Sequence, residues 1–177
     1  SPIGDMTPVL IALGAELVLR SGDKTRTVAV QDYFVSYKVT VLQPGEFIEL
    51  IRIPRAKPEH LFQVYKISKR LEDDISAVCG AFYLHLVDNQ VQDARIAYGG
   101  MAEIPKRASH CEAALVGKPW QQSSVDQAML ALGKDFSPIS DFRASAEYRQ
   151  RVAANLLHRV LLESSEPATP VRVTHYA

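Results

Sequence analysis

Alternating apolar and polar positions predict the strands in the first third of the chain. In residues 47–53, apolar side chains alternate with Glu49 and Arg52, which predicts a half-buried strand that ends before a proline. Residues 16–20 and 25–30 flank a short Ser-Gly-Asp turn, and this arrangement predicts a hairpin. A small sheet is therefore expected in this part of the chain.

The middle of the chain has three longer apolar segments. Residues 61–68, 77–87 and 91–98 predict strands, and the polar turn Asp-Asn-Gln at residues 88–90 joins the second to the third. Short connections favour antiparallel pairing, because a parallel pair needs a long crossover. We therefore expect a three-stranded antiparallel sheet here.

Helical spacing dominates after residue 100. Residues 107–115 and 124–132 predict two helices, because a glycine that can end a helix follows each of them. Residues 145–163 predict the longest helix, because apolar residues at positions 152, 156 and 160 share one face. A shorter helix is expected over residues 6–15, with a proline in its first turn.

A charged segment with two prolines near it, residues 55–60, is the best domain boundary in the chain. The part before it is expected to be a small α/β unit. The part after it is expected to be three antiparallel strands packed by helices. The fold class of this second part is therefore α+β.

Composition narrows the class of function. The 20 basic and 20 acidic residues give a formal net charge of zero, which argues against a general binder of nucleic acid or of anionic membranes. No apolar run reaches the length of a membrane span, so no membrane partner is expected. Cys79 and Cys111 form no Cys-x-x-Cys motif, which indicates a reducing, cytoplasmic compartment and excludes a cysteine-ligated iron–sulfur cluster within this chain.

The most charged segment joins two apolar segments. Residues 66–75 read Lys-Ile-Ser-Lys-Arg-Leu-Glu-Asp-Asp-Ile, and six of these ten side chains are charged. Such a segment is either a solvated turn or the edge of a site, and composition alone favours the turn.

The scattered histidines and cysteines have structural interpretations. The five histidines show no spacing typical of metal ligands, so no metal site is expected. Cys79 lies in an apolar segment and is expected to be buried and inert. His110 and Cys111 would point in different directions on a helix, so they do not form a predicted catalytic pair.

A denser polar group precedes the last predicted helix. Ser145 can cap this helix, and Asp141 can pair with Arg143 or Arg149. This network would fix where the helix leaves the sheet rather than act on a substrate.

Five stretches, taken in order, resemble one family: the FAD-binding subunits or domains of molybdenum hydroxylases, and above all the small subunit of bacterial xanthine dehydrogenases. They are Ser-Pro-Ile-Gly-Asp at residues 1–5 with Pro8 following, residues 47–54, residues 66–75, Ala-Tyr-Gly-Gly-Met-Ala at 97–102 with Pro-Lys-Arg-Ala at 105–108, and residues 141–149. Each stretch is short, but at these spacings they cover nearly the whole chain. The medium subunit of carbon monoxide dehydrogenase shares the later motifs.

The resemblance implies a division of the fold. Residues 1–56 would be the end of an α/β FAD-binding domain. Residues 59–177 would be the C-terminal domain of these flavoproteins, a three-stranded antiparallel sheet packed with a helical bundle. The boundary expected from the residues themselves, 55–60, agrees with this division.

The resemblance also implies a cofactor site. By this resemblance, Ser1 and Asp5, the first and last residues of the Ser-Pro-Ile-Gly-Asp motif, would be cofactor-binding residues, and so would Ile48 and Lys66. An aliphatic side chain can cover the flat apolar flavin ring, and a cation near the ring favours its reduced anion. No catalytic residue is expected in this chain, which would not oxidise the substrate itself.

The loop after Lys66 would lie near the flavin ring and the path of the nicotinamide of NAD. Arg70, Glu72, Asp73 and Asp74 are therefore candidates for shaping access to the flavin, although a solvated loop explains them equally well.

Other cofactors of the family lie elsewhere. In relatives the glycine-rich segment that binds the FAD pyrophosphate lies upstream of the Ser-Pro-Ile motif, as do the 2Fe-2S clusters, and the molybdenum cofactor lies on another chain or domain. The chain is therefore expected to be part of a larger subunit. Its partners would be upstream FAD-binding and 2Fe-2S domains and a molybdenum-binding subunit.

Three functions remain open from the sequence. The first is the flavin part of a xanthine dehydrogenase-like enzyme, which passes electrons from iron–sulfur clusters through FAD to NAD. The second is the flavoprotein of another molybdenum hydroxylase, such as a carbon monoxide dehydrogenase or an enzyme that oxidises aldehydes or N-heterocycles. The third is a non-catalytic interaction module.

Overall fold

The computed structural model describes residues 3–70 and 73–165. Their elements, in chain order, are α1 (Met6–Ala12), β1 (Glu16–Ser21), β2 (Lys24–Ala29), a 3-10 turn (Val30–Asp32), β3 (Phe34–Ser36), β4 (Val39–Thr40), β5 (Phe47–Arg52), β6 (His60–Ile67), β7 (Val78–Val87), β8 (Gln90–Gly99), β9 (Lys106–Arg107), α2 (Ser109–Leu115), α3 (Gln122–Leu132) and α4 (Ala146–Ser165).

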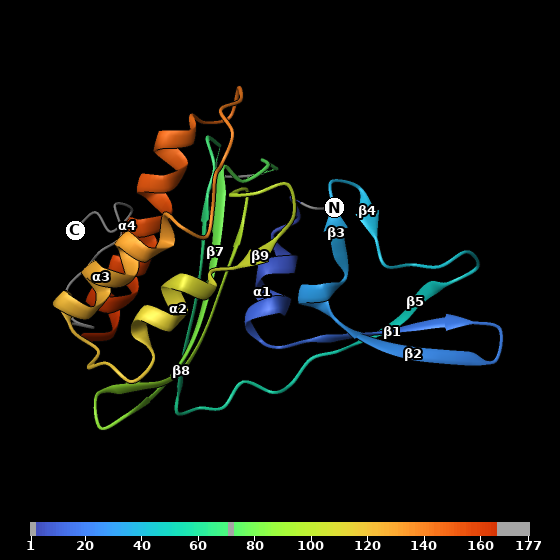
Figure 1. Ribbon diagram of the computed structural model, residues 1–177, viewed down its shortest axis with the longest axis horizontal. Coiled ribbons are helices and arrows are strands. Elements are labelled where there is room, and N and C mark those ends of the chain that lie inside the picture. Colours follow the sequence, from blue (N-terminus) through green and yellow to red (C-terminus); the bar gives the residue numbers. More distant parts are fainter. Residues whose placement is uncertain (1–2, 71–72, 166–177) are drawn as a thin grey trace.

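A long antiparallel sheet in the order β6-β7-β8-β9 forms the centre of the molecule (Figure 1). The three predicted strands β6, β7 and β8 are confirmed, and the two-residue strand β9 adds a short edge beside β8. Strand β9 follows a six-residue connection, residues 100–105, and was not predicted, because a strand of two residues leaves too little alternation to detect.

Both faces of this sheet are covered. Helices α2, α3 and α4 pack on one face and α1 packs on the other (Figure 1). The sequence of β7 is nearly continuously apolar because both faces of the strand are buried. Phe82 belongs to the core beneath the three helices, while Ala81 and Tyr83 pack with Ala12 of α1. The mixed α+β class is thus confirmed. Among the helices of the described residues, none is both long enough and apolar enough to cross a membrane.

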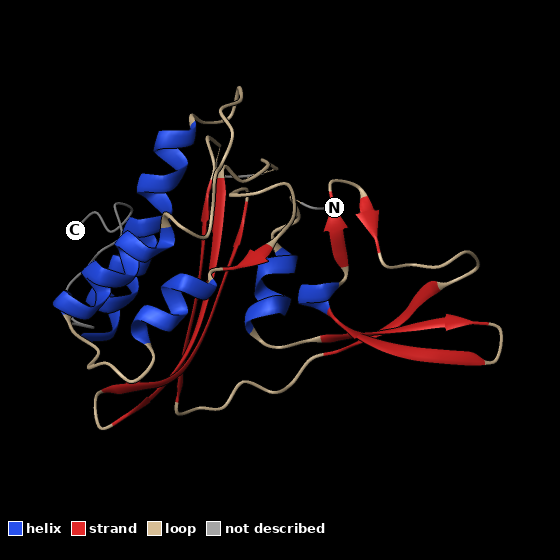
Figure 2. Cartoon of the chain, in the orientation of Figure 1, coloured by secondary structure: helices blue, strands red, loops and turns tan. Residues whose placement is uncertain are grey.

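The N-terminal region adds a second sheet in the order β2-β1-β5 and a small hairpin of β3 and β4 (Figure 2). The predicted hairpin of β1 and β2 is confirmed. The prediction that residues 47–53 form a half-buried strand is wrong in its burial. All six residues of β5 are exposed, because β5 is an edge strand that pairs with β1 and projects away from α1.

The helix from the N-terminal region packs on the sheet of the C-terminal region. Ile11 shares a cluster with Ala97 of β8, and Pro8 lies against Gly99. This packing brings Asp5 to the end of β6 and the start of β7, where the charged segment lies.

Candidate functional site

Lys66, the seventh residue of β6, lies at the centre of a polar cluster. Its Nζ donates a hydrogen bond of 2.7 Å to Oδ2 of Asp5 and another of 2.6 Å to the backbone oxygen of Asp74. Lys66 pairs with Cys79 across the sheet, and its neighbour Ile67 joins the core on the other face. The charged end of Lys66 therefore lies on the face that α1 covers.

Asp5 holds this cluster together from the start of α1. One carboxylate oxygen accepts from Lys66, and the other accepts a 2.6 Å hydrogen bond from the Ser76 hydroxyl. Asp5 occupies the N-cap position of α1 but makes no side-chain capping bond there, because its carboxylate is turned toward β6 and β7. The backbone oxygen of Asp5 also lies 3.7 Å from the Cys79 sulfur.

The electrostatics of the cluster keep Lys66 charged. The hydrogen bond that Lys66 donates to Asp5 raises the pKa of the Lys66 ammonium above its usual value, and the charge of the carboxylate adds to this effect. An ammonium has three N–H donors, and two of them reach acceptors among the described residues. The third donor, on a side chain that is 40% exposed, is available to an acceptor from a ligand.

Two of the four loop candidates stabilise the loop itself. The Asp74 carboxylate accepts a 2.9 Å hydrogen bond from the Arg70 backbone N–H and pairs with the Arg70 guanidinium at 3.4 Å. The backbone hydrogen bond from Arg70 lowers the pKa of Asp74. Asp73 is exposed and has a φ of +49°, a left-handed conformation that aspartate tolerates. Ser1 and Glu72 lie outside the described residues.

Ile48, the predicted apolar flavin contact, lies on a different sheet from Lys66. It is on β5, opposite Leu19 of β1, and its side chain is exposed. The described contacts bring Asp5 and Lys66 together with Ser76 and Asp74, but they do not connect Ile48 to this group.

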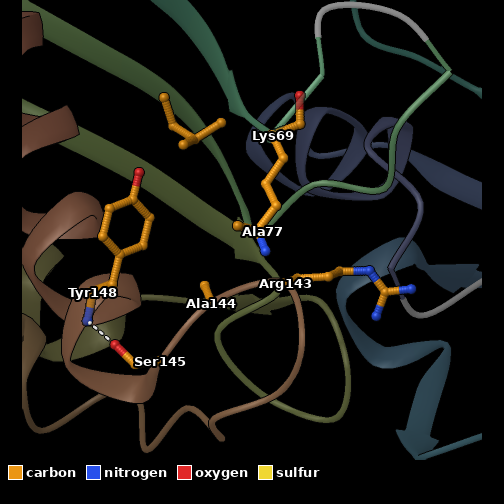
Figure 3. Close-up of a pocket in the computed structure, with 8 residues that line it drawn as sticks. Lys69, Ala77, Arg143, Ala144, Ser145 and Tyr148 are labelled. Atoms are coloured by element: carbon orange, nitrogen blue, oxygen red, sulfur yellow. Dashed lines mark hydrogen bonds between the residues drawn. The ribbon is translucent and has the colours of Figure 1, made fainter.

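A pocket of about 420 Å³ opens between the end of β6 and the start of α4. In Figure 3, Lys69 extends toward Ala77 at the edge of the pocket, with Tyr148 on the opposite side, and the Arg143 side chain points away from Tyr148. Lys69 Nζ donates to the backbone oxygen of Phe142, so the charged segment is tied to the chain that precedes α4. Within the described residues, no three side chains of metal-ligating type gather as a metal site.

The polar group before α4 forms as predicted. Asp141 pairs with Arg149 at 2.7 Å and with Arg143 at 3.6 Å, and the Tyr148 backbone N–H donates to the Ser145 hydroxyl at 3.1 Å as in a helix cap. Ser76, by contrast, was not among the predicted site residues. Its role depends on the docking of α1, for which the sequence carries no local signal.

Both cysteines are expected to resist labelling in the folded protein. Burial, followed by the nearby Asp5 charge, raises the pKa of the Cys79 thiol to about 12, and burial also raises the pKa of Cys111. The reactive thiolate is therefore scarce at neutral pH. Alkylation at pH 8 with peptide mapping should leave both residues unmodified until the protein unfolds. Rapid labelling of either residue in the native protein would contradict this burial.

The fold and the cluster define an α+β protein in which α1 packs on one face of the β6–β9 sheet and three helices pack on the other, with a charged site at the end of β6. The family described as the CO dehydrogenase flavoprotein C-terminal domain matches residues 63–164, and the FAD binding domain in molybdopterin dehydrogenase matches residues 1–56. The chain belongs to this family of molybdenum hydroxylase flavoproteins.

Individual relatives agree with this assignment. The chain is 36% identical to a xanthine dehydrogenase of Emericella nidulans over 164 residues and 34% identical to a nicotinate hydroxylase of the same organism over 166 residues. Each alignment covers 90% of this chain and 12% of the relative. A carbon monoxide dehydrogenase structure from Hydrogenophaga pseudoflava matches with a TM-score of 0.84 and 27% identity, covering 90% of this chain and 55% of the other.

Proposed function

We propose that this chain is the flavin-site part of a xanthine dehydrogenase-like molybdenum hydroxylase, in which electrons pass from iron–sulfur clusters through FAD to NAD. The ion pair between Lys66 and Asp5 carries the proposal. It joins a residue of the segment that matches the FAD-binding domain to a residue of the β6–β9 sheet, and it leaves one ammonium donor for a ligand.

The residues of the cluster fit a flavin. The free N–H of Lys66 would donate to a carbonyl oxygen or ring nitrogen of the flavin, and the remaining lone pairs of Asp5 would accept from a flavin N–H or hydroxyl. Ile48 would add an exposed aliphatic contact from the neighbouring sheet. FAD, when bound, would supply a carrier that accepts single electrons and delivers them in pairs.

The ion pair with Asp5 weakens the effect of the Lys66 charge on the flavin ring. An isolated cation would strongly favour a negatively charged ring. Asp5 lies 2.7 Å from the ammonium, so the two charges largely cancel at a distance and act as a dipole. Lys66 would therefore orient the ring by a directed hydrogen bond more than by its net charge.

The loop that follows Lys66 would shape access to the flavin. Arg70 and Asp74 are bonded to each other, and the charged residues Glu72 and Asp73 stand between them in the sequence. A charged rim of this kind would guide the nicotinamide of NAD toward the flavin while the ring itself stays covered.

The proposal of xanthine as the substrate oxidised at molybdenum is supported by the alignments alone. The relatives include a xanthine dehydrogenase at 36% identity and a nicotinate hydroxylase at 34% identity, so an enzyme that hydroxylates another N-heterocycle is the second candidate. We propose a cytoplasmic complex that also contains upstream FAD-binding and 2Fe-2S domains and a molybdenum-binding subunit. The two free cysteines agree with a reducing compartment.

An absorption spectrum tests the flavin assignment. The natural full-length protein, purified with its partners, is expected to show the absorption spectrum of bound FAD. Residues 1–177 alone are expected to retain no FAD. A colourless full-length complex would refute the flavin function. NAD reduction by the complex with xanthine, compared with nicotinate, would then separate the two candidate substrates.

A further inference from the structure

Arg149 is a buried cation in the first turn of α4. Its residue is 3% exposed, and its guanidinium donates to three acceptors that come from three separate segments. Nη1 donates to the backbone oxygen of Ala77 and, at 2.9 Å, to that of Gly100, while Nη2 donates to Oδ1 of Asp141 at 2.7 Å. Its Nε is buried and has no hydrogen-bond partner among the described residues.

The backbone conformation at Gly100 and the hydrogen bonds of Asp141 place their oxygens next to Arg149. Gly100 has a φ of +81°, and a Cβ at this position would overlap the Ala77 carbonyl oxygen, so a glycine lets the two backbones approach. The Asp141 carboxylate that balances the charge also accepts from the backbone N–H groups of Arg143 and Ala144. Arg149 therefore joins α4, the end of β8 and the start of β7.

A short path connects this clamp to the candidate flavin site. Ala77 directly follows Ser76, whose hydroxyl donates to Asp5, which in turn accepts from Lys66. The Ala77 N–H also donates to the backbone oxygen of Ile67, and Ile67 is the residue that follows Lys66. A shift of the Ala77 carbonyl would move Ser76 and loosen the Asp5 cluster on the other face of the sheet.

We propose that Arg149 is a positioning residue that holds Ser76 and Asp5, and through them Lys66, in the geometry that receives the flavin. This inference rests on the proposed function for its consequence in FAD binding, but the clamp itself can be measured without FAD. The planar guanidinium reaches two carbonyls with Nη1 and a carboxylate with Nη2, whereas a lysine would carry all its donors on a single nitrogen and would not match this spacing.

Cys79 gives a cofactor-free measurement. Its sulfur lies beside the backbone of Asp5, whereas Cys111 is a buried residue of α2 in the core between the helices and the sheet. In the full-length protein freed of FAD, Arg149→Lys is expected to raise the alkylation rate of Cys79 about tenfold, with Cys111 changed less than about twofold. Arg151→Lys is the matched control, because Arg151 lies two residues along α4 and, among the described residues, pairs with the exposed Glu147.

A second measurement links the clamp to the cofactor. Arg149→Lys is expected to weaken FAD binding about tenfold in the wild-type background but less than about twofold when Lys66 is already replaced by glutamine. Asp141→Asn keeps Arg149 but removes the negative charge that balances it. This variant should also weaken FAD binding more in the wild-type background than in the Lys66→Gln background, by a smaller factor than Arg149→Lys.

The outcomes separate the two claims. Equal acceleration of both thiols would show that Arg149 stabilises the whole domain, and unchanged thiols would show that it does not hold the cluster; either result overturns the proposal. Equal weakening of FAD binding in both backgrounds would also overturn it. If Cys79 alone is exposed but the wild-type protein binds no FAD, the clamp stands and the flavin function fails.

Discussion

Lys66→Met is expected to weaken FAD binding by the full-length flavoprotein by roughly thirtyfold, or about 2 kcal/mol. The substitution removes the donor proposed for the flavin and leaves the Asp5 carboxylate without its cation, and a lost charge-assisted hydrogen bond typically costs this much. Asp5→Ala should weaken binding in the same way, because it releases both Lys66 and Ser76. Titration of the FAD-free protein, followed by quenching of flavin fluorescence, measures the affinity.

His110→Ala is the control for this series. His110 lies on α2, its side chain is largely exposed, and its Nδ1 contacts Asp135 rather than any residue of the cluster. The affinity of the His110→Ala variant for FAD should stay within about twofold of the wild-type value. Equal retention of FAD by all three variants would remove Lys66 and Asp5 from the site.

Gly100→Ala is expected to have the largest effect on stability, about 3 kcal/mol. The new methyl group would overlap the Ala77 carbonyl oxygen, and the residue would also have to keep a φ of +81°, which is strained for alanine. Chemical denaturation of the FAD-free protein, followed by circular dichroism, measures the loss.

Gly117→Ala separates the two causes. Gly117 has a similar φ of +76°, but a Cβ there would meet no atom within 4 Å. This variant should therefore lose only about 1 kcal/mol, the cost of the backbone conformation. Equal losses in both variants would mean that the close approach of Gly100 to Ala77 does not matter for stability.

The central elements of the fold follow from local sequence, because their patterns are long. β7 and β8 each span ten residues, and their apolar runs and polar turn predict a hairpin without knowledge of neighbours. The β3–β4 hairpin was missed because its strands have only three and two residues. The burial of β5 was predicted wrongly because alternation shows only that a strand has an apolar face. Whether another element covers that face depends on tertiary structure.

The candidate site was predictable only in part. Asp5 and Lys66 were named from a resemblance, and the structure places their charged groups 2.7 Å apart although 61 residues separate them in the chain. Ser76 gave no signal, since an isolated serine after a charged loop is common. The pairing of Asp141 with Arg149 was predicted from spacing, but the carbonyls that Arg149 also binds come from the ends of two strands that meet only in the folded protein.

The most direct test of the central claim is a structure of the full-length flavoprotein with FAD bound. The proposal predicts that Lys66 Nζ keeps its hydrogen bond to Asp5 and places its third N–H within about 3 Å of an oxygen or nitrogen of the flavin ring. A flavin ring bound out of reach of both Lys66 and Asp5 would contradict it.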